Sequence, residues 1–189
     1  MADAISSPRL NVSDVRDRLG ETPSILSVLC GGWPDQLWRI NEGDGTWSAH
    51  EVLCHLIHGE DDDWIPRMRQ IIEDAGREPF RPFDRKKGLE TYGRESPSRL
   101  LGLFSQKRTL SLQTLDAWAL DARTLSETGV HPEFGTVTLE QLLATWVTHD
   151  FAHVVQIARL AAKYYGGWAG PWRAYFSVFR DDERISSGR

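Results

Sequence analysis

Two histidines spaced four residues apart could bind a metal ion. His149 and His153 lie in the segment from Thr138 to Tyr165, which has the periodicity of a helix. Four helical steps place the two side chains within about 40° of each other and one turn apart. Both imidazoles can then reach one ion, which lies about 2 Å from each ligand nitrogen.

Both histidines also fall on the apolar stripe of this segment, which includes Leu142, Trp146 and Ile157. A buried imidazole needs either hydrogen-bond partners or a metal ion. The pair therefore indicates a metal site. The alternative is two structural histidines, each satisfied by a polar neighbour.

A third ligand is expected from the segment between Ser48 and Asp74. Its apolar run from Val52 to Ile57 contains His55, and His58 follows directly. The run is apolar nearly all round, so its pattern does not decide between these two histidines. His50 lies in the first turn and is expected to face solvent.

The spacing of His149 and His153 is also that of the zinc-protease motif H-E-x-x-H, in which the Glu acts as general base. Asp150 stands at that position, and its side chain is one methylene shorter. The sequence also lacks the β-structure expected beside a protease cleft, so it disfavours this class.

Four helices are predicted to position these residues, and no segment shows the period-2 alternation of a half-buried strand. The helices run from about Ser13 to Cys30, Ser48 to Asp74, Ser96 to Trp118 and Thr138 to Tyr165. Capping-box pairs, Ser48 with Glu51 and Thr138 with Gln141, mark the starts of the second and the fourth. The sequence therefore predicts an all-α fold, a four-helix bundle.

Prolines and one long link shape the bundle. Pro23 should kink the first helix or start it afresh, and Pro66 should bend the second, because proline lacks a backbone N–H and clashes with the preceding turn. The link from Ala75 to Glu95 has about 20 residues, although antiparallel neighbours need only about 2–8. A link of this length can cross the whole bundle, so the second and third helices should be parallel.

The chain is expected to form one domain, with residues 1–12 as an N-terminal arm and residues 166–189 as an aromatic C-terminal extension. A short helix is predicted after Gly170. Aromatic residues in the extension recur on one helical face: Trp168, Trp172, Tyr175, Phe176 and Phe179. We expect them to pack against the bundle. A partner interface is the alternative.

The composition disfavours several classes of function. The chain has 22 Lys and Arg residues against 27 Asp and Glu residues, a net charge of −5 that does not favour nucleic acid or anionic membranes. The one basic cluster lies around Arg77, Arg81, Arg85, Lys86 and Lys87 and is expected to be a solvated loop. Cys30 and Cys54 lie in apolar runs and should pack in the core. No secretory signal and no stretch of roughly 20 apolar residues is visible, so a cytoplasmic location is expected.

Several short motifs occur together in a familiar order. Trp47, His55-Leu56 and Glu60 resemble the "W…HL…E" segment of the DinB-like (DinB/YfiT) superfamily. A later stretch resembles that superfamily's "HP…G…T…HD…H…QI" segment: His131-Pro132, Gly135, Thr138, His149-Asp150, His153 and Gln156-Ile157. The resemblance covers about a third of the chain.

The resemblance implies a four-helix bundle with an up-down-down-up order of helices. It also implies one divalent metal ion, with nickel or zinc expected first and iron or manganese as alternatives. Carried over to this sequence, the metal ligands are His55, His149 and His153.

Three protein ligands leave a coordination position open, which is typical of a reactive site. Similar proteins include thiol-dependent transferases and metal-dependent hydrolases. The first hypothesis is therefore a metal-dependent enzyme that activates a thiol or a water for attack on a small-molecule substrate, with a low-molecular-weight thiol as a candidate partner. The second is a non-enzymatic metal- or ligand-binding module, or a stress-related homodimer in which the metal is structural.

Four further polar residues are candidates for supporting the ligands. Gln156 could orient a ligand or a bound water, and Asp150 and Glu60 could act as bases or as partners of the ligands. Glu51 could accept a hydrogen bond from His55 but is also the capping-box residue. The link between the second and third helices could lie over the site as a lid, with Phe80, Phe83 and Tyr92.

Overall fold

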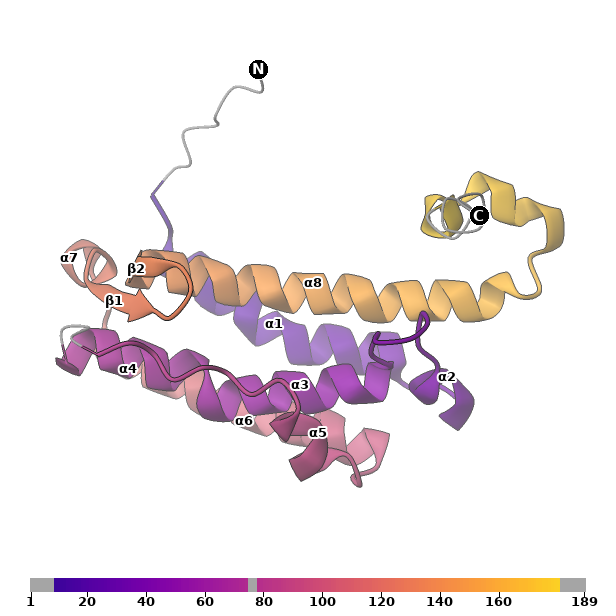
Figure 1. Ribbon diagram of the computed structural model, residues 1–189, viewed down its shortest axis with the longest axis horizontal. Coiled ribbons are helices and arrows are strands. Elements are labelled where there is room, and N and C mark those ends of the chain that lie inside the picture. Colours follow the sequence, from indigo (N-terminus) through magenta and orange to yellow (C-terminus); the bar gives the residue numbers. More distant parts are fainter. Residues whose placement is uncertain (1–8, 75–77, 181–189) are drawn as a thin grey trace, which may run out of the picture.

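Four long helical stretches form the body of the molecule in the computed structural model, which describes residues 9–74 and 78–180 (Figure 1). They are α1 (Val12–Cys30), α3 (Ala49–Asp62) continued by α4 (Trp64–Asp74), α6 (Pro97–Trp118) and α8 (Leu139–Gly166). In Figure 1, α1 and α8 run from left to right, whereas α3, α4 and α6 run from right to left. The predicted up-down-down-up order is therefore confirmed.

The predicted helix starts are confirmed by their caps. Ser48 and Glu51 form a reciprocal capping box at α3, and Thr138 and Gln141 form one at α8. Ser96 accepts a hydrogen bond from the backbone of Arg99 at the start of α6. The caps satisfy backbone N–H groups that have no partner inside the helix.

Of the two proline predictions, a fresh start at Pro23 is wrong, whereas disruption of the second helix by Pro66 is confirmed, at an earlier residue than the proline. Pro23 lies inside α1, which continues without a new start. Proline cannot donate to the carbonyl of Leu19, and that carbonyl instead accepts a hydrogen bond from Arg108 at 2.7 Å. Pro66 does interrupt its helix, but the break lies at Asp63, between α3 and α4, because the missing bond and the ring clash fall in the preceding turn.

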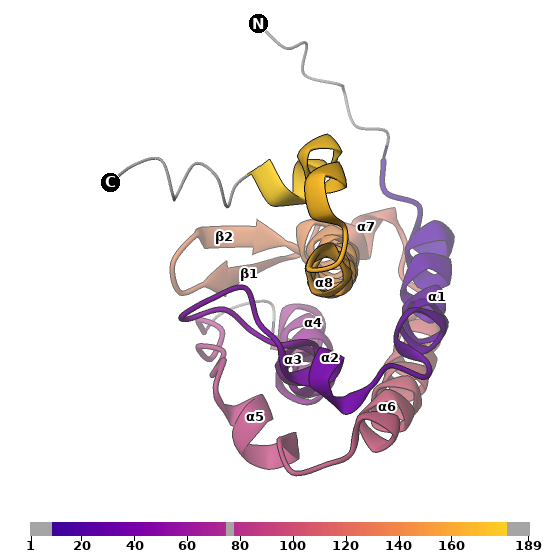
Figure 2. The same cartoon turned by 90° about the vertical axis from the view of Figure 1, so that its right-hand side faces the viewer.

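A short β-hairpin was not predicted. Strands β1 (Thr128–His131) and β2 (Gly135–Thr138) pair antiparallel, and Pro79 forms a parallel bridge with Val130 of β1. Each strand has only four residues, too few to show an alternating pattern. The hairpin lies beside the beginning of α8, at the end of the bundle where α4 ends (Figures 1 and 2).

Short elements complete the links: α2 (Asp35–Arg39), α5 (Lys87–Tyr92) and α7 (Ala122–Leu125). The link between α4 and α6 runs back along α3 and α4 as predicted, and its α5 packs on α3 (Figure 1). Residues 1–8 of the predicted arm, and Arg77 of the basic cluster, lie outside the described residues.

The core has two buried clusters at opposite ends of the bundle, one around Trp64 and Trp146 and one around Leu53 and Phe104. Cys30 and Cys54 are buried as expected. No helix in the described ranges is long and apolar enough to cross a membrane.

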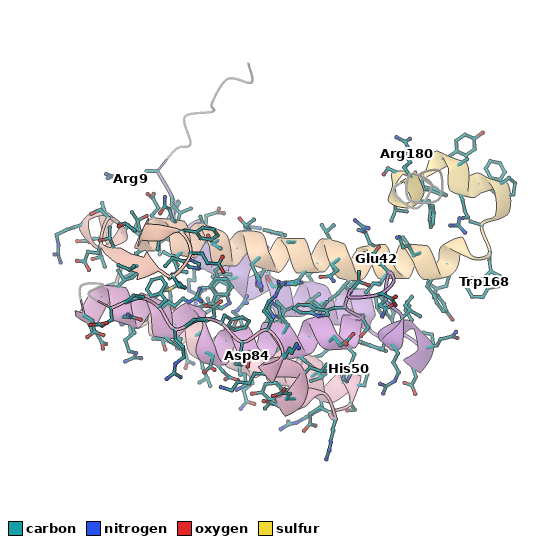
Figure 3. All side chains as sticks on the ribbon, in the orientation of Figure 1. Arg9, Glu42, His50, Asp84, Trp168 and Arg180 are labelled. Atoms are coloured by element: carbon teal, nitrogen blue, oxygen red, sulfur yellow. The ribbon has the colours of Figure 1, made fainter. Side chains whose placement is uncertain are left out.

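The expected packing of the aromatic extension is confirmed at Phe179 and is wrong for the other four aromatic residues. The extension forms two 3-10 helices, η1 (Gly170–Tyr175) and η2 (Ser177–Phe179). Trp168 is 73% exposed and projects from the bundle in Figure 3, whereas Phe179 is buried and lies close to Gly166. A change of direction after α8 breaks the single helical face on which the expectation relied.

Candidate metal centre

Three imidazoles converge between α3 and α8. The Nε2 atom of His149 lies 2.9 Å from that of His55 and 3.2 Å from that of His153. His55 comes from α3 and is 7% exposed, and the other two come from successive turns of α8. The structure thus brings together the three histidines that the family resemblance singled out.

The chemistry of this group fits a divalent cation. Burial lowers the pKa of His55 to about 2 and that of His153 to about 4, so both rings are neutral near pH 7 and offer lone pairs. The ligand atoms all lie within 4.8 Å of one another. In the described part of the chain, no fourth His, Cys, Asp or Glu joins the group. Three imidazoles with room for a further ligand are the donor set of a catalytic zinc-type site.

Aromatic rings surround the three histidines. The Trp47 ring lies 4.7 Å from that of His55, and the Trp64 ring lies 5.1 Å from that of His149. Phe83, from the link between α4 and α6, meets His55 edge-on at 5.4 Å. These contacts fix the imidazole planes and limit access of water.

Gln156 contacts one of the three histidines. Its Oε1 accepts a hydrogen bond from His153 Nδ1 at 2.9 Å. A proton on Nδ1 leaves the lone pair of Nε2 directed at the other two histidines. The spacing of three residues on a helix makes this contact possible.

Asp150 and Glu60 meet on a buried arginine that sequence reasoning missed. Arg108 of α6 bonds Asp150 of α8 at 2.6 Å and Glu60 of α3 at 2.8 Å, and all three side chains are 1–2% exposed. Asp150 Oδ1 also lies 4.0 Å from His149 Nδ1. Arg108 sits in an otherwise ordinary amphipathic helix, and its placement inward depends on partners from three other helices.

The pKa directions of the two carboxyl groups differ. Burial raises the pKa of Glu60 despite its ion pair with Arg108. Burial also acts on Asp150, but the nearby His149 imidazole and the ion pair with Arg108 outweigh burial and lower the pKa of Asp150. Asp150 is therefore the ionised partner of Arg108 that lies beside one of the three histidines.

Two other expectations need correction. His50 is buried rather than solvent-facing, and its Nε2 donates to the Glu95 carbonyl at 3.0 Å, because the link between α4 and α6 covers the start of α3. Glu51 Oε2 accepts from Ser48 in the capping box, while His55 Nδ1 has no partner among the described residues. Glu51 therefore does not orient His55.

His58, the alternative ligand, lies outside the group. Its ring stacks on Phe83 at 4.8 Å, and its Nε2 lies 3.9 Å from Asp62. The geometry of α3 therefore selects His55, a choice that the apolar run alone left open.

A cavity of about 550 Å³ opens over the three histidines. Its wall includes Asp63, Trp64, Phe80 and Phe83, together with His131 of the hairpin. Of the residues in the lid prediction, Phe80 and Phe83 line this cavity. Tyr92 does not line this cavity, and its hydroxyl donates to Asp61 at 2.6 Å.

Asp63 is a second residue that sequence reasoning missed. It lies at the break between α3 and α4, and its Oδ1 is 2.6 Å from Arg67 Nε. Burial raises its pKa despite the positive charge of Arg67. Pro66 causes the break and could be seen in the sequence. The break lies three residues before the proline, so the sequence did not point to Asp63.

The fold and the histidine group together define a helical-bundle protein with a candidate centre for one divalent metal. Residues 18–157 match the DinB superfamily, and the chain belongs to this superfamily. The family resemblance seen in the sequence is thereby confirmed.

Individual relatives agree with this assignment. The chain is 24% identical over 159 residues to the Bacillus subtilis (strain 168) protein named "Putative metal-dependent hydrolase YfiT". The matched residues make up 80% of this chain and 83% of that relative. The solved structure of YfiT from Bacillus subtilis, described as a four-helix bundle of unusual topology, has a TM-score of 0.72 and 22% identity. That comparison covers 87% of this chain and 93% of YfiT, and it shows a shared fold.

Proposed function

We propose that this protein is a metal-dependent hydrolase of a small-molecule substrate, with His55, His149 and His153 as the ligands of one divalent cation. The observation that carries the proposal is the three-imidazole group at the floor of a cavity of about 550 Å³. A closed structural site would surround the ion with four protein ligands, whereas this group leaves a position facing the cavity. The name of the YfiT relative supports the same reaction class.

A cation held there would lower the pKa of a coordinated water and polarise a substrate carbonyl. The chain's own residues would do the rest. Gln156 keeps His153 in the tautomer that presents Nε2 to the ion. The rings of Trp64 and Phe83 hold an apolar substrate group and exclude bulk water.

Asp63 is the carboxyl group best placed to hold the transferred proton. It lines the cavity beside His149 and Trp64, and its raised pKa brings it closer to the range in which a carboxylate accepts and returns a proton. Its ion pair with Arg67 keeps the side chain in that position.

Nickel or zinc suits this set of imidazole ligands, and iron or manganese are the alternatives. A transferase that uses a low-molecular-weight thiol is the second candidate function. A second cavity, of about 520 Å³, also reaches His153 and could hold a second substrate. A structural metal in a non-enzymatic homodimer, and a cytoplasmic location, stay predictions.

The test is hydrolysis of a panel of aryl esters and amides by protein loaded with zinc or with nickel. We expect turnover that a chelator abolishes and the metal restores, and that His153→Ala lowers by at least about a hundredfold. His131→Ala is the matched control, because His131 lines the same cavity but lies outside the group, and it should keep its metal. Turnover that survives both the chelator and His153→Ala would contradict the proposal.

A further inference from the structure

Two cavities meet at one arginine beside the metal centre. Arg85 and His153 line both the cavity of about 550 Å³ and the cavity of about 520 Å³. The guanidinium of Arg85 lies 5.2 Å above the ring of Trp47, and that ring is 4.7 Å from the ring of His55. Arg85 and His55 therefore contact the same aromatic ring.

We propose that Arg85 binds an anionic group of the substrate, a carboxylate or a phosphate, at this junction. The inference rests on the proposed hydrolase function and deepens it, because it names the substrate class. The substrate is a small ester or amide with an apolar body and one anionic group.

The first support is the balance of charge around the cavities. Asp63 is already paired with Arg67 at 2.6 Å. Glu42, in the second cavity, is paired with Arg159 at 2.8 Å and with Lys163 at 3.0 Å.

Glu51, which also lines the second cavity, accepts a hydrogen bond from Ser48 in the cap of α3. Glu133, which lines the first cavity, lies on the exposed turn of the hairpin. Arg85 itself forms no ion pair with any residue in the ranges 9–74 and 78–180. Its positive charge is thus available to a ligand.

The second support is the way in which Arg85 is held. The guanidinium carbon of the exposed Arg85 lies over the Trp47 ring, and its N–H groups donate to no acceptor in residues 9–74 and 78–180. A guanidinium edge matches a carboxylate or phosphate with two parallel hydrogen bonds. An arginine that lies over an aromatic ring and has no carboxylate partner among the described residues is therefore suited to an anion.

The third support is the apolar wall on the other side of the junction. Trp64, Phe80 and Phe83 line the larger cavity. The link that carries Phe83 and Arg85 lies along α3 and α4, where Asp84 marks it in Figure 3. One segment therefore contributes both an apolar contact and an anion-binding contact.

The test compares two esters that differ by one charge, 4-acetoxybenzoate and its methyl ester, with zinc-loaded protein. Arg85→Gln should lower kcat/KM for release of acetate from 4-acetoxybenzoate by at least about tenfold, the loss expected for one charge-assisted hydrogen bond. The same variant should leave the neutral ester within about twofold.

Arg81→Gln is the matched control. Arg81 lies on the same link, is exposed and carries the same charge, but it lines neither cavity. We expect both esters to react within about twofold of wild type in this variant. An equal loss on both esters in Arg85→Gln, or an equal loss in Arg81→Gln, would overturn the proposal.

A binding measurement separates this inference from the hydrolase proposal. Calorimetry with benzoate and with inorganic phosphate, on zinc-loaded and on metal-free protein, reports anion binding without turnover. Weaker binding of either anion in Arg85→Gln, at unchanged zinc content, supports the inference even if neither ester reacts. Unchanged affinity for both anions would refute it even if both esters react.

Discussion

Individual contacts hold the three histidines of the proposed metal centre in different ways. His153 is fixed by a hydrogen bond to Gln156, and His149 lies near Asp150, whereas His55 is held by the rings of Trp47 and Phe83. The metal affinity should therefore depend on side chains that are not themselves ligands.

Gln156→Leu should weaken binding of zinc by about 10–100-fold, because His153 Nδ1 then loses its acceptor. Competition with a chromogenic chelator measures the change. Gln156→Glu keeps an acceptor at the same position and should stay close to wild type. Equal affinities for zinc in the wild type and Gln156→Leu would show that the hydrogen bond does not orient the ligand.

Arg108→Met should lower the free energy of unfolding by about 3–5 kcal/mol, because it leaves Glu60 and Asp150 buried without their partner. Urea unfolding measures this loss. Arg123→Met removes an arginine whose side chain is 81% exposed, and it should change stability by less than about 0.5 kcal/mol. If the two variants unfolded at the same urea concentration, the buried pair would not have the role described.

Among the elements, α8 was the most predictable. Its cap, its length and the one-turn spacing of two ligands all follow from local rules that act within one helix. The position of α3 against α8 was not predictable from periodicity, since Val52 to Ile57 is apolar nearly all round. The choice of His55 over His58 came from the family resemblance, and tertiary packing agrees with it.

Prolines show why other elements were missed. The effect of Pro66 appears three residues earlier, at Asp63, and places a carboxyl group in the cavity. Pro23 frees a carbonyl that receives Arg108, a partner more than 80 residues away in the sequence. Such consequences depend on which element lies opposite, and periodicity carries no information about that.

The contact between α5 and α3 gives a test at this scale. A Cβ atom at Gly88 would lie 2.6 Å from the Cys54 carbonyl oxygen and 3.0 Å from His58 Cβ. Gly88→Ala should therefore push α5 away from α3 and cost about 1–3 kcal/mol of unfolding free energy. It should also reduce ester hydrolysis, because the link that carries Phe83 and Arg85 leads into α5.

Gly102→Ala is the control for Gly88→Ala, because a Cβ at Gly102 of α6 meets nothing within 4 Å. Alanine in a helix interior should stabilise it by up to about 1 kcal/mol. The two substitutions are therefore expected to shift the urea midpoint in opposite directions. A shift in the same direction would mean that α5 does not pack as described.

For the molecule as a whole, the length of the link between α4 and α6 was enough to predict that the second and third long helices are parallel. A link of this size permits parallel helices, and the structure has them. The aromatic extension was not predictable in this way, because a helical stripe describes a face only if the helix continues. The turn after Gly166 ends that face and leaves Trp168 and Trp172 exposed.

The stability of the whole metal-free protein should fall on mild acidification. Burial lowers the pKa of His153 to about 4 and that of His55 to about 2, whereas in the unfolded chain both lie near 6.5. Below about pH 6.5 the unfolded state therefore binds more protons than the folded state, and stability decreases by up to about 1.4 kcal/mol per pH unit for each histidine.

Urea unfolding of metal-free protein between about pH 6.5 and about pH 5 measures how the free energy of unfolding depends on pH. This range lies above the pH at which carboxyl groups with ordinary pKa values titrate. The double variant His55→Leu, His153→Leu should show a shallower dependence on pH. An equal dependence on pH in the wild type and the double variant would contradict burial of the two neutral imidazoles, because the raised pKa values of Glu60 and Asp63 act in both proteins.

The most direct test of the metal centre is the metal content of the protein after loading with zinc and gel filtration. The wild type and His131→Ala should each retain one ion per chain, and His55→Ala, His149→Ala and His153→Ala should each lose it. A tightly held ion that persists when all three of those histidines are replaced by alanine would contradict the assignment.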